Sequence, residues 1–422
     1  MLAQGDSDLY SNILEFILQM VPFAKLRTQL YFNHSGIFFI ETKTLFGAYM
    51  AANYGTYFSD RTEKSVPYQY TLNSYLRYDF GGDGGTTEVA NMVLDLFEHT
   101  NNITQLKRYM PLLMETLIFY DSHYEKTSDP ITGKEKMYIF PTQALETYWC
   151  AWKNSSDLNN GTWVPPNQSN CVKNDHPTVV SLHVLAERSF RLLRNVSRDI
   201  WTPSLEALLL KLQQTLPDIP TIVENGTERT SPYENYPIDD ELHNSETPEL
   251  YGVHPFRYYT QGRQLLSNIN ISPAIQCLTN STRATCTKNA MNNNGWTQGI
   301  MNAALLGLNN LTKNMLIQRV QTAPAIGYRF EAFAPHEQDY EPSADHYANM
   351  ITAYQWMLLQ PADDENGSII LFGAWPCEWD VEFKLHGPQN TIVEGIIKDG
   401  QVISLHVEPE ERAKHVYNML YC

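Results

Sequence analysis

The sequence predicts a mainly α-helical fold, arranged as a toroid of helices and followed by a small C-terminal β domain. Up to about residue 360, apolar residues recur at i, i+3, i+4 and i+7, which places them on one face of a helix. After residue 365, short runs rich in β-branched and aromatic residues alternate with turn residues. We therefore expect a helical barrel over residues 1–365 and a β domain over residues 366–422.

Eight segments of the predicted barrel carry the helical spacing: 9–30, 37–53, 87–99, 104–124, 178–193, 204–216, 297–308 and 348–359. Asp175 and Asn102 each precede one of them and are of the residue types that cap a helix N-terminus. The longest connections are rich in Tyr, Trp and His, so we expect ordered loops that form a site: 58–75, 150–175, 217–251 and 323–345.

The last part of the chain contains four predicted strands: 369–372, 381–385, 391–397 and 401–407. Turn residues separate them at His386-Gly387-Pro388 and Lys398-Asp399-Gly400, and Asp-Gly is a strong hairpin signal. This pattern predicts either a small β domain or the closing half of a larger β-sandwich.

Composition excludes several classes of partner. A net charge of −17 argues against nucleic acid, because phosphate binding needs a basic face. No apolar run approaches the roughly 18 residues of a membrane-spanning helix. The glycine-rich run 81–88 lacks the Lys-Ser/Thr of a phosphate-binding loop, and the His336, Glu337, Asp339 group fits no metal-ligand spacing. We expect no cofactor and no metal.

Sequons and cysteines predict a secreted or lumenal glycoprotein. Asn-x-Ser/Thr acceptors begin at eleven asparagines: Asn33, Asn102, Asn154, Asn160, Asn167, Asn195, Asn225, Asn270, Asn280, Asn310 and Asn366. The six cysteines form an even set, as in oxidising compartments. The spacings suit local disulfides Cys150–Cys171 and Cys277–Cys286, while Cys377 and Cys422 can pair or stay free.

The first residues, 1–6, contain neither the basic start nor the apolar stretch of a signal peptide. Because a chain rich in sequons needs a secretion signal, we expect a longer precursor with a further N-terminal module.

Two carboxylates in aromatic surroundings are the main candidates for chemistry. Glu146 lies in Pro141–Trp149, and Asp345 precedes His346-Tyr347 and an apolar helix. A carboxyl pressed against aromatic surface is desolvated, which raises its pKa and suits it to act as a general acid. Cleaving a glycosidic bond with inversion needs such an acid and an ionised carboxylate that activates water, roughly 6.5–9.5 Å away. The alternatives are a surface glutamate for Glu146 and a helix N-cap for Asp345.

Several motifs occur in the order known from one enzyme family: Asn33–Thr42, Gly81–Glu88, Pro141–Trp149, Asp345–Gln360, Leu371–Pro376 and Val381–Leu385. Together they resemble the six-hairpin, (α/α)6-barrel glycoside hydrolases grouped with 1,2-α-L-fucosidases and maltose phosphorylases. The similarity is greatest to a poorly characterised, fucosidase-like branch and covers nearly the whole chain. It implies a (α/α)6 catalytic barrel, in the family preceded by a β-sandwich.

The resemblance also assigns roles. It implies Glu146 as the general acid, Asp345 as the base and Asn33 near the position that orients the water. The other substrate-binding positions that it implies are His34, Glu41, Asp83, Tyr148, Trp149 and His346, with Glu41 a rival carboxylate. Because Asn33 is also a sequon, a glycan on it would be incompatible with a catalytic role.

Two motifs differ from the fucosidases. They have Ser-Pro-Glu-Asn around the acid where this chain has Ala144-Leu145-Glu146-Thr147, and Asp-Gly-Asn where it has Asp345-His346-Tyr347. The carboxylates are kept, but the fucose-specific surroundings are not.

We therefore expect an inverting glycoside hydrolase that acts on an α-linked sugar or polysaccharide. One alternative is a carbohydrate-binding glycoprotein that has lost catalysis. Another is a polysaccharide lyase on the same toroid, with Tyr258 or His254 as the reacting group.

Overall fold

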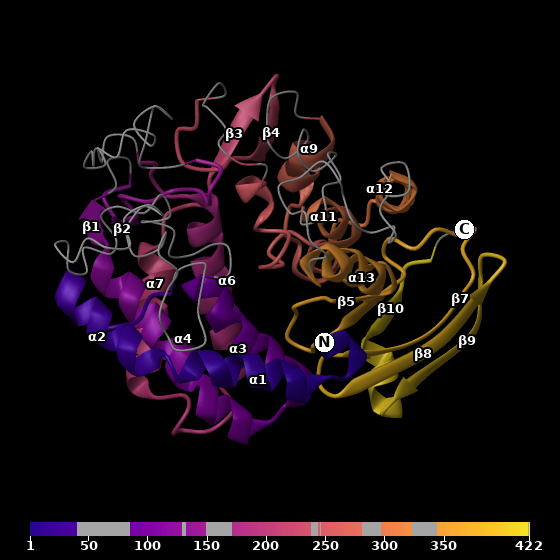
Figure 1. Ribbon diagram of the computed structural model, residues 1–422, viewed down its shortest axis with the longest axis horizontal. Helices are drawn as coiled ribbons and strands as arrows, with labels where there is room; N and C mark the ends of the chain where they lie inside the picture. The colour runs from indigo at the N-terminus through magenta and orange to yellow at the C-terminus, as the bar shows by residue number, and fades with distance from the viewer. Residues whose placement is uncertain are drawn as a thin grey trace, which may run out of the picture.

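The computed structural model describes residues 1–39, 85–128, 132–148, 171–237, 244, 246–280, 297–322, 344–420 and 422. Within these residues the protein consists mainly of α-helices with small β-sheets, which confirms the mainly α class. Two groups of helices lie side by side, and the C-terminal sheets flank the second group (Figure 1).

Six helices form the first group: α1 (Ser7–Leu18), α2 (Val21–Phe32), α3 (Thr86–Thr100), α4 (Ile103–His123), α6 (His176–Leu193) and α7 (Pro203–Thr215). α3 packs against α4 and α6, and α7 packs against α4 and α6. Their apolar faces form one buried cluster that includes Leu14, Leu94, Leu113, Leu182 and Leu209. Two hairpins lie beside the helices. β1 (Glu125–Ser128) pairs with β2 (Glu135–Tyr138), which contacts α7, and β3 (Thr221–Glu224) pairs with β4 (Thr227–Thr230), which contacts the helix over Ser272–Asn280.

The second group contains five helices: α8 (Gln261–Ser267), α9 (Ser272–Asn280), α11 (Gly299–Leu305), α12 (Asn309–Thr322) and α13 (Ala344–Leu358). α11 packs against both α12 and α13. Three short 3-10 helices complete the helical part of the described chain: η1 (Leu2–Gln4), η4 (Pro248–Leu250) and η6 (Glu410–His415).

Two three-stranded sheets end the chain. In the first, β6 (Ile369–Leu371) lies between antiparallel β5 (Leu359–Pro361) and parallel β10 (Val416–Asn418). The second is an antiparallel meander of β7 (Val381–Gly387), β8 (Thr391–Lys398) and β9 (Gln401–Glu408). Asp399 and Gly400 both have positive φ at the β8–β9 turn, as the Asp-Gly hairpin pattern predicts.

Some predicted elements differ from the structure. The predicted helix 9–30 is two helices, because Pro22 lacks a backbone donor and is tolerated only in the first turn of a helix, here α2. Residues 37–39 of the predicted helix 37–53 are not helical, since the Ile37 amide donates to the carbonyl of Glu115 in α4. Residues 40–53 lie outside the described residues. Periodicity alone did not predict α8, α9, α12 or the two hairpins in the helical part.

The predicted domain boundary at residue 365 lies in the connection between β5 and β6. A second buried cluster contains residues from both sides of it, including Leu250, Met357, Ile369, Phe383 and Val407. The two-domain division therefore stays a prediction.

A buried ion cluster joins the helix groups. On α6, Arg188 contacts Glu98 at 2.6 Å and Asp95 at 2.8 Å, both from α3. Arg257, which precedes α8, contacts the same Asp95 at 2.7 Å and Asp363, which follows β5, at 2.9 Å.

A third arginine completes the ion cluster. Arg191, one turn after Arg188 on α6, contacts Glu98 at 2.6 Å. With Arg188 and Arg257 this gives three guanidinium groups opposite three carboxylates, those of Asp95, Glu98 and Asp363. The ion cluster is therefore neutral as a whole, although it contains six charges.

Burial and charge act in opposite directions on these carboxylates. Burial alone would raise the pKa of Asp95, but Arg257 and Arg188 outweigh it and hold the pKa at about 2. The same balance of burial against the arginines lowers the pKa of Glu98 and of Asp363. The carboxylates are thus ionised at neutral pH, and the pKa values of Arg188 and Arg257 are raised by the carboxylates beside them, although burial opposes the shift.

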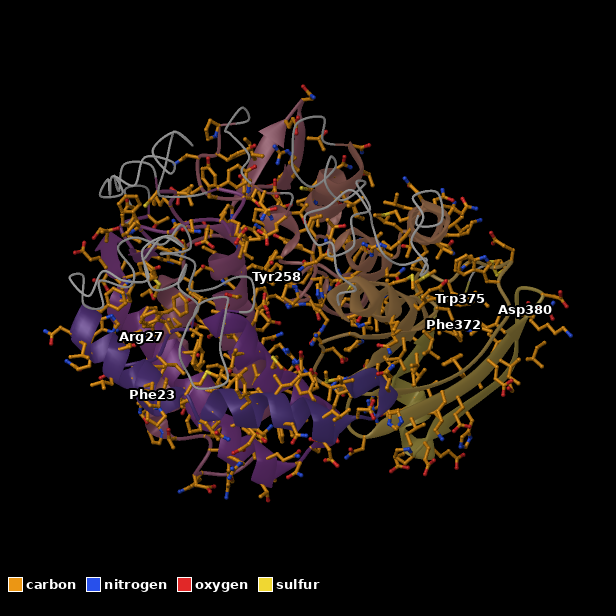
Figure 2. The ribbon with its side chains drawn as sticks, in the orientation of Figure 1. Phe23, Arg27, Tyr258, Phe372, Trp375 and Asp380 are labelled. Atoms are coloured by element: carbon orange, nitrogen blue, oxygen red, sulfur yellow. A yellow bond between two sulfur atoms is a disulfide. The ribbon has the colours of Figure 1, made fainter. Side chains whose placement is uncertain are left out.

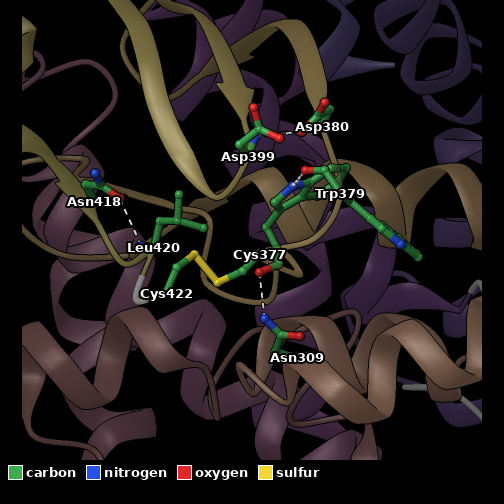
Figure 3. The surroundings of a disulfide bond; sticks show 9 residues. Asn309, Cys377, Trp379, Asp380, Asp399, Asn418, Leu420 and Cys422 are labelled. Carbon is green, nitrogen blue, oxygen red and sulfur yellow. Dashed lines mark hydrogen bonds between the residues drawn. A yellow bond between two sulfur atoms is a disulfide. The ribbon is translucent and has the colours of Figure 1, made fainter.

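A disulfide joins Cys377 to Cys422, 45 residues later, and fixes the end of the chain beside the sheets (Figure 3). Cys171 and Cys277 are also disulfide-bonded. Cys150 and Cys286, their predicted partners, lie outside the described residues. No helix in the described part of the chain is long and apolar enough to cross a membrane.

We predict that Arg257→Met lowers the free energy of unfolding by about 3–5 kcal/mol, because it removes the closest arginine of Asp363 and one of the two arginines of Asp95, and so leaves the buried ion cluster with an uncompensated negative charge. Arg194→Ala is the control, since Arg194 forms an exposed pair with Glu365, and we expect a loss of about 0–1 kcal/mol. Chemical denaturation of both variants measures the difference. Equal losses would show that the ion cluster contributes no more than a surface pair.

The ion cluster also predicts acid sensitivity. The pKa of Asp95 falls from an ordinary 3.8 to about 2 on folding, so its contribution is complete above the unfolded pKa and disappears as the pH falls through the folded one. We expect the free energy of unfolding to fall between about pH 4 and pH 2, and less steeply in Asp95→Asn. Denaturation at several pH values tests this. Identical slopes in the two proteins would contradict it.

Candidate active site around Glu146

Glu146 lies at the end of a tightly closed loop, residues 141–148. The backbones of Ala144 and Tyr148 form a bridge with two hydrogen bonds of 3.3 and 3.2 Å, and Thr142 pairs with Val172. Leu145, at the tip, has a φ of 55°, which is uncommon for a residue with a branched side chain. Strained positions of this kind persist where the surrounding structure fixes them, and they concentrate at functional sites.

The side chain of Leu145 explains how the strain is held. It is completely buried in an apolar cluster with Val180 and Val184 of α6 and with Tyr251 and Phe256. Burying a leucine side chain contributes about 1.5–3 kcal/mol, similar to the cost of the backbone strain. The buried side chain of Leu145 therefore fixes the backbone from which the next residue, Glu146, extends.

Glu146 is half-buried and contacts a second segment of the chain. The Nδ2 of Asn244 donates to Glu146 Oε2 at 2.7 Å. The backbone amide of Glu146 donates to Glu246 Oε2 at 3.2 Å, and the Thr147 hydroxyl donates to the Glu246 carbonyl at 3.1 Å. Asn244 thus orients the carboxyl group, and Glu246 fixes its backbone.

The contact with Asn244 does not depend on the protonation state of Glu146. Oε2 of Glu146 can accept the hydrogen bond from Asn244 whether the carboxyl group is protonated or ionised. A side chain that transfers a proton needs a fixed orientation of this kind. Glu246 adds a second carboxylate to the same site.

A buried hydrogen-bond chain ties the loop to α6. Asp175, the N-cap of α6, accepts from the Thr142 hydroxyl at 2.6 Å and from the Thr178 amide at 2.9 Å. Burial raises the pKa of Asp175 to about 6, although the hydrogen bonds from Thr142 and Thr178 partly oppose the shift. The loop that carries Glu146 is therefore anchored at the first turn of α6.

His176 follows this cap and is also buried. Burial lowers its pKa to about 4, so the imidazole is neutral at pH 7. Its ring stacks on Tyr259, and both lie against Gly252, where an added Cβ would come within 3.0 Å of His176 Nε2 and 2.8 Å of Tyr259. The segment around Gly252 thus packs tightly against the start of α6.

Tyr148 was expected to bind substrate, and the structure places it in the interior. It is 2% exposed, its ring packs edge-on against Tyr233 and Tyr236, and its hydroxyl donates to that of Tyr236 at 3.2 Å. These rings pack with Ala144 in an apolar cluster beside the loop. The expected apolar setting of the Glu146 carboxyl itself stays a prediction.

The second predicted carboxylate is placed only by its backbone. α13 begins at Ala344, so Asp345 and His346 belong to its first turn and do not precede the helix. Their side chains, and with them the distance between the two carboxyl groups, lie outside the described residues. The expected separation stays a prediction.

Other predicted site residues are placed elsewhere or not described. Asn33 is exposed at the end of α2, where Gln29 Nε2 donates to its Oδ1 at 3.1 Å. His34 is bound to His123 of α4 at 2.9 Å. No contact between these two residues and Glu146 appears in the described part of the chain. Glu41, Asp83 and Trp149 lie outside it.

The two residues expected for a lyase are poorly suited to that chemistry. Tyr258 lies between the two groups of helices (Figure 2). Burial raises its pKa even though Arg263 lies 4.8 Å above its ring, which disfavours the phenolate that a tyrosine base requires. Burial lowers the pKa of His254 to about 3, and its ring contacts Trp356 edge-on.

The described residues contain no group of three or more His, Cys, Asp or Glu side chains that could hold a metal ion. Compared with models of known protein families and with curated proteins, the chain matches none. The chemistry of the Glu146 site is therefore the basis for any assignment of function.

Sequence reasoning missed Asn244 and Glu246, which lie about one hundred residues after Glu146, and nothing in their local sequence distinguishes them. It did identify Asp175 as a helix cap, but not its link to the loop.

We predict that Thr142→Val lowers the free energy of unfolding by about 1–3 kcal/mol, because the isosteric side chain leaves the buried Asp175 carboxyl without one of its hydrogen-bond donors. Thr142→Ser keeps the hydroxyl and should recover most of this loss. Chemical denaturation of the two variants tests the link. If valine and serine behave alike, the hydrogen bond to Asp175 does not hold the loop.

Proposed function

We propose that the chain is an inverting glycoside hydrolase that acts on an α-linked sugar or polysaccharide, with Glu146 as general acid and Asp345 as general base. The observation that carries the proposal is the Glu146 loop, in which a strained backbone and two hydrogen bonds from Asn244 and to Glu246 fix one carboxyl group. A carboxyl group held in a fixed orientation suits proton donation to a glycosidic oxygen.

The position of Asp345 supports the second role. It stands in the first turn of α13, and α13 packs on α11 within the second helix group, whereas Glu146 is anchored on α6 of the first. An acid and a base that approach a sugar from opposite faces need supports on opposite sides of it. We propose that the helices close into the toroid that the sequence predicts and that the sugar binds between the two groups.

The proposed reaction uses only residues of this chain. Glu146 transfers its proton to the leaving oxygen as the glycosidic bond breaks. Asp345 removes a proton from the water that attacks the anomeric carbon from the opposite face. Asn244 keeps Glu146 oriented throughout, because its amide can donate to Oε2 in both protonation states.

We further propose that the enzyme works in a secretory or extracellular compartment. The Cys377–Cys422 bond and the bonded state of Cys171 and Cys277 support this, since disulfides persist in oxidising compartments.

We predict that Glu146→Gln lowers kcat by about 10²–10⁴-fold, the usual contribution of a general acid. Glutamine has nearly the same shape and keeps a carbonyl oxygen for Asn244, so the fold should be unchanged. Glu135→Gln, at an exposed carboxylate on β2, is the control and should retain full activity. The assay is release of reducing ends from α-linked aryl glycosides and oligosaccharides. Full activity of Glu146→Gln would exclude Glu146 as the acid.

The stereochemistry gives a separate test. Proton NMR of the first product should show inversion at the anomeric carbon, and Asp345→Asn should lose activity to an extent comparable to Glu146→Gln. Retention of configuration would rule out the proposed pair, and an unsaturated product would indicate a lyase. If the wild-type protein binds the sugars without cleaving them, it is a binding protein.

A further inference from the structure

The sequon asparagines occupy a particular part of the structure. Eight of the eleven lie within the described residues, and all eight are exposed: Asn33, Asn102, Asn195, Asn225, Asn270, Asn280, Asn310 and Asn366. Of the thirteen other asparagines described, only seven are exposed, namely Asn12, Asn101, Asn235, Asn268, Asn314, Asn390 and Asn418. Among the described residues, a larger share of asparagines is therefore exposed at the sequons than elsewhere.

This distribution is what glycosylation requires. An N-linked glycan is bulky and hydrophilic, and it is compatible with folding only at the surface. A sequon at a buried position, such as those of Asn91, Asn174 or Asn302, would prevent the modified chain from packing. None of the eight described sequons conflicts with the folded structure.

Three sequons also present the correct atom. The glycan is carried by Nδ2, and at Asn33, Asn102 and Asn270 the protein uses Oδ1 instead. The donors are Gln29 Nε2, the Gln105 amide and the Ser272 amide, each at 3.1 Å. Among the described residues, Nδ2 of these three asparagines makes no hydrogen bond. A glycan can therefore be attached while the cap on α4 at Asn102 and the turn at Asn270 remain intact.

At two other sequons, Nδ2 of the asparagine does donate a hydrogen bond. Asn280 donates from Nδ2 to Gln276 Oε1 at 2.7 Å, and Asn366 donates from Nδ2 to Asp364 Oδ2 at 3.4 Å. A glycan on either nitrogen replaces one of its two hydrogens, so these contacts would have to be shared or lost.

We propose that the chain is N-glycosylated at its exposed sequons, first of all at Asn33, Asn102 and Asn270. In the reaction, Nδ2 loses one proton and bonds to the anomeric carbon of a lipid pyrophosphate-linked oligosaccharide. The bond between that carbon and the pyrophosphate oxygen breaks, and the lipid pyrophosphate leaves with the electron pair. The secretory pathway supplies the oligosaccharide donor.

The proposal changes one expected role and is compatible with the others. A glycosylated Asn33 is a surface residue and not a group that orients catalytic water. The Glu146 loop and its supports belong to the described residues of 132–148, 171–194 and 228–269, and none of these ranges contains a sequon. Glycans at the eight described positions are thus attached outside the segments that form the candidate active site.

The test is peptide mapping of the protein isolated from the cells that produce it. Release of glycans by an N-glycosidase in ¹⁸O water converts each modified asparagine to labelled aspartate. We expect label at Asn33, Asn102 and Asn270 and none at Asn101, an exposed asparagine outside any sequon. The absence of label at all three sites would overturn the proposal, whether or not the protein cleaves a sugar.

Matched variants at one site separate modification from folding. In the full chain secreted behind a cleavable leader, Thr104→Ala destroys the sequon but keeps the Asn102 cap, and Thr104→Ser keeps both. Thr104 is exposed, so neither change disturbs packing. We expect Thr104→Ala alone to lose the mass of one glycan. Equal masses of the alanine and serine variants would remove Asn102 from the set.

Discussion

The neutral, buried ion cluster between α3, α6, Arg257 and Asp363 is the constraint on which the arrangement of this protein depends. A single buried ion pair contributes little, because desolvation cancels much of the attraction. Here each carboxylate is shared between arginines, so that Asp95 serves both Arg188 and Arg257, and Glu98 serves both Arg188 and Arg191. Separating these buried charges would leave some of them desolvated without an opposite charge, which is costly. The ion cluster therefore holds the two helix groups in one relative position.

The candidate active site is built on the same elements as the ion cluster. α6 starts at the Asp175 cap, which holds Thr142 of the loop that carries Glu146, and about three turns later it presents Arg188. The segment that contains Arg257 also supplies Tyr251 and Phe256, on which Leu145 packs. The position of Glu146 is therefore set from two sides by elements that the ion cluster locks together. Side chains that act in catalysis must be held rigidly, because a small displacement of the reacting group lowers the reaction rate strongly.

The surface of the protein carries a disulfide, exposed sequons and exposed ion pairs. The Cys377–Cys422 bond holds the C-terminal end beside β7, and the described sequons all lie where a glycan can be accommodated. The exposed charges pair loosely, as at Arg194–Glu365, and add little stability. Stability thus comes from the interior, whereas the surface is suited to an oxidising compartment.

Local pattern in the sequence determined much of the fold. The spacing of apolar residues predicted α3, α4, α6 and α7 to within two residues, and the Asp-Gly turn predicted the β8–β9 hairpin. It could do so because helix and hairpin formation depend on residues only a few positions apart. The same local pattern identified Glu146 as a candidate acid from its aromatic surroundings.

Only the tertiary structure decided what surrounds that carboxylate. Asn244 is 98 residues from Glu146, and Arg257 is 162 residues from Asp95. No local periodicity links such residues, because their contact arises from how separate helices pack. The left-handed backbone at Leu145 is likewise imposed by burial against Tyr251 and Phe256, since its own preference is for another conformation. The sequence by itself predicted α3, α4, α6 and α7 and singled out Glu146 as a candidate, whereas the packing of residues far apart in the chain decided what contacts Glu146.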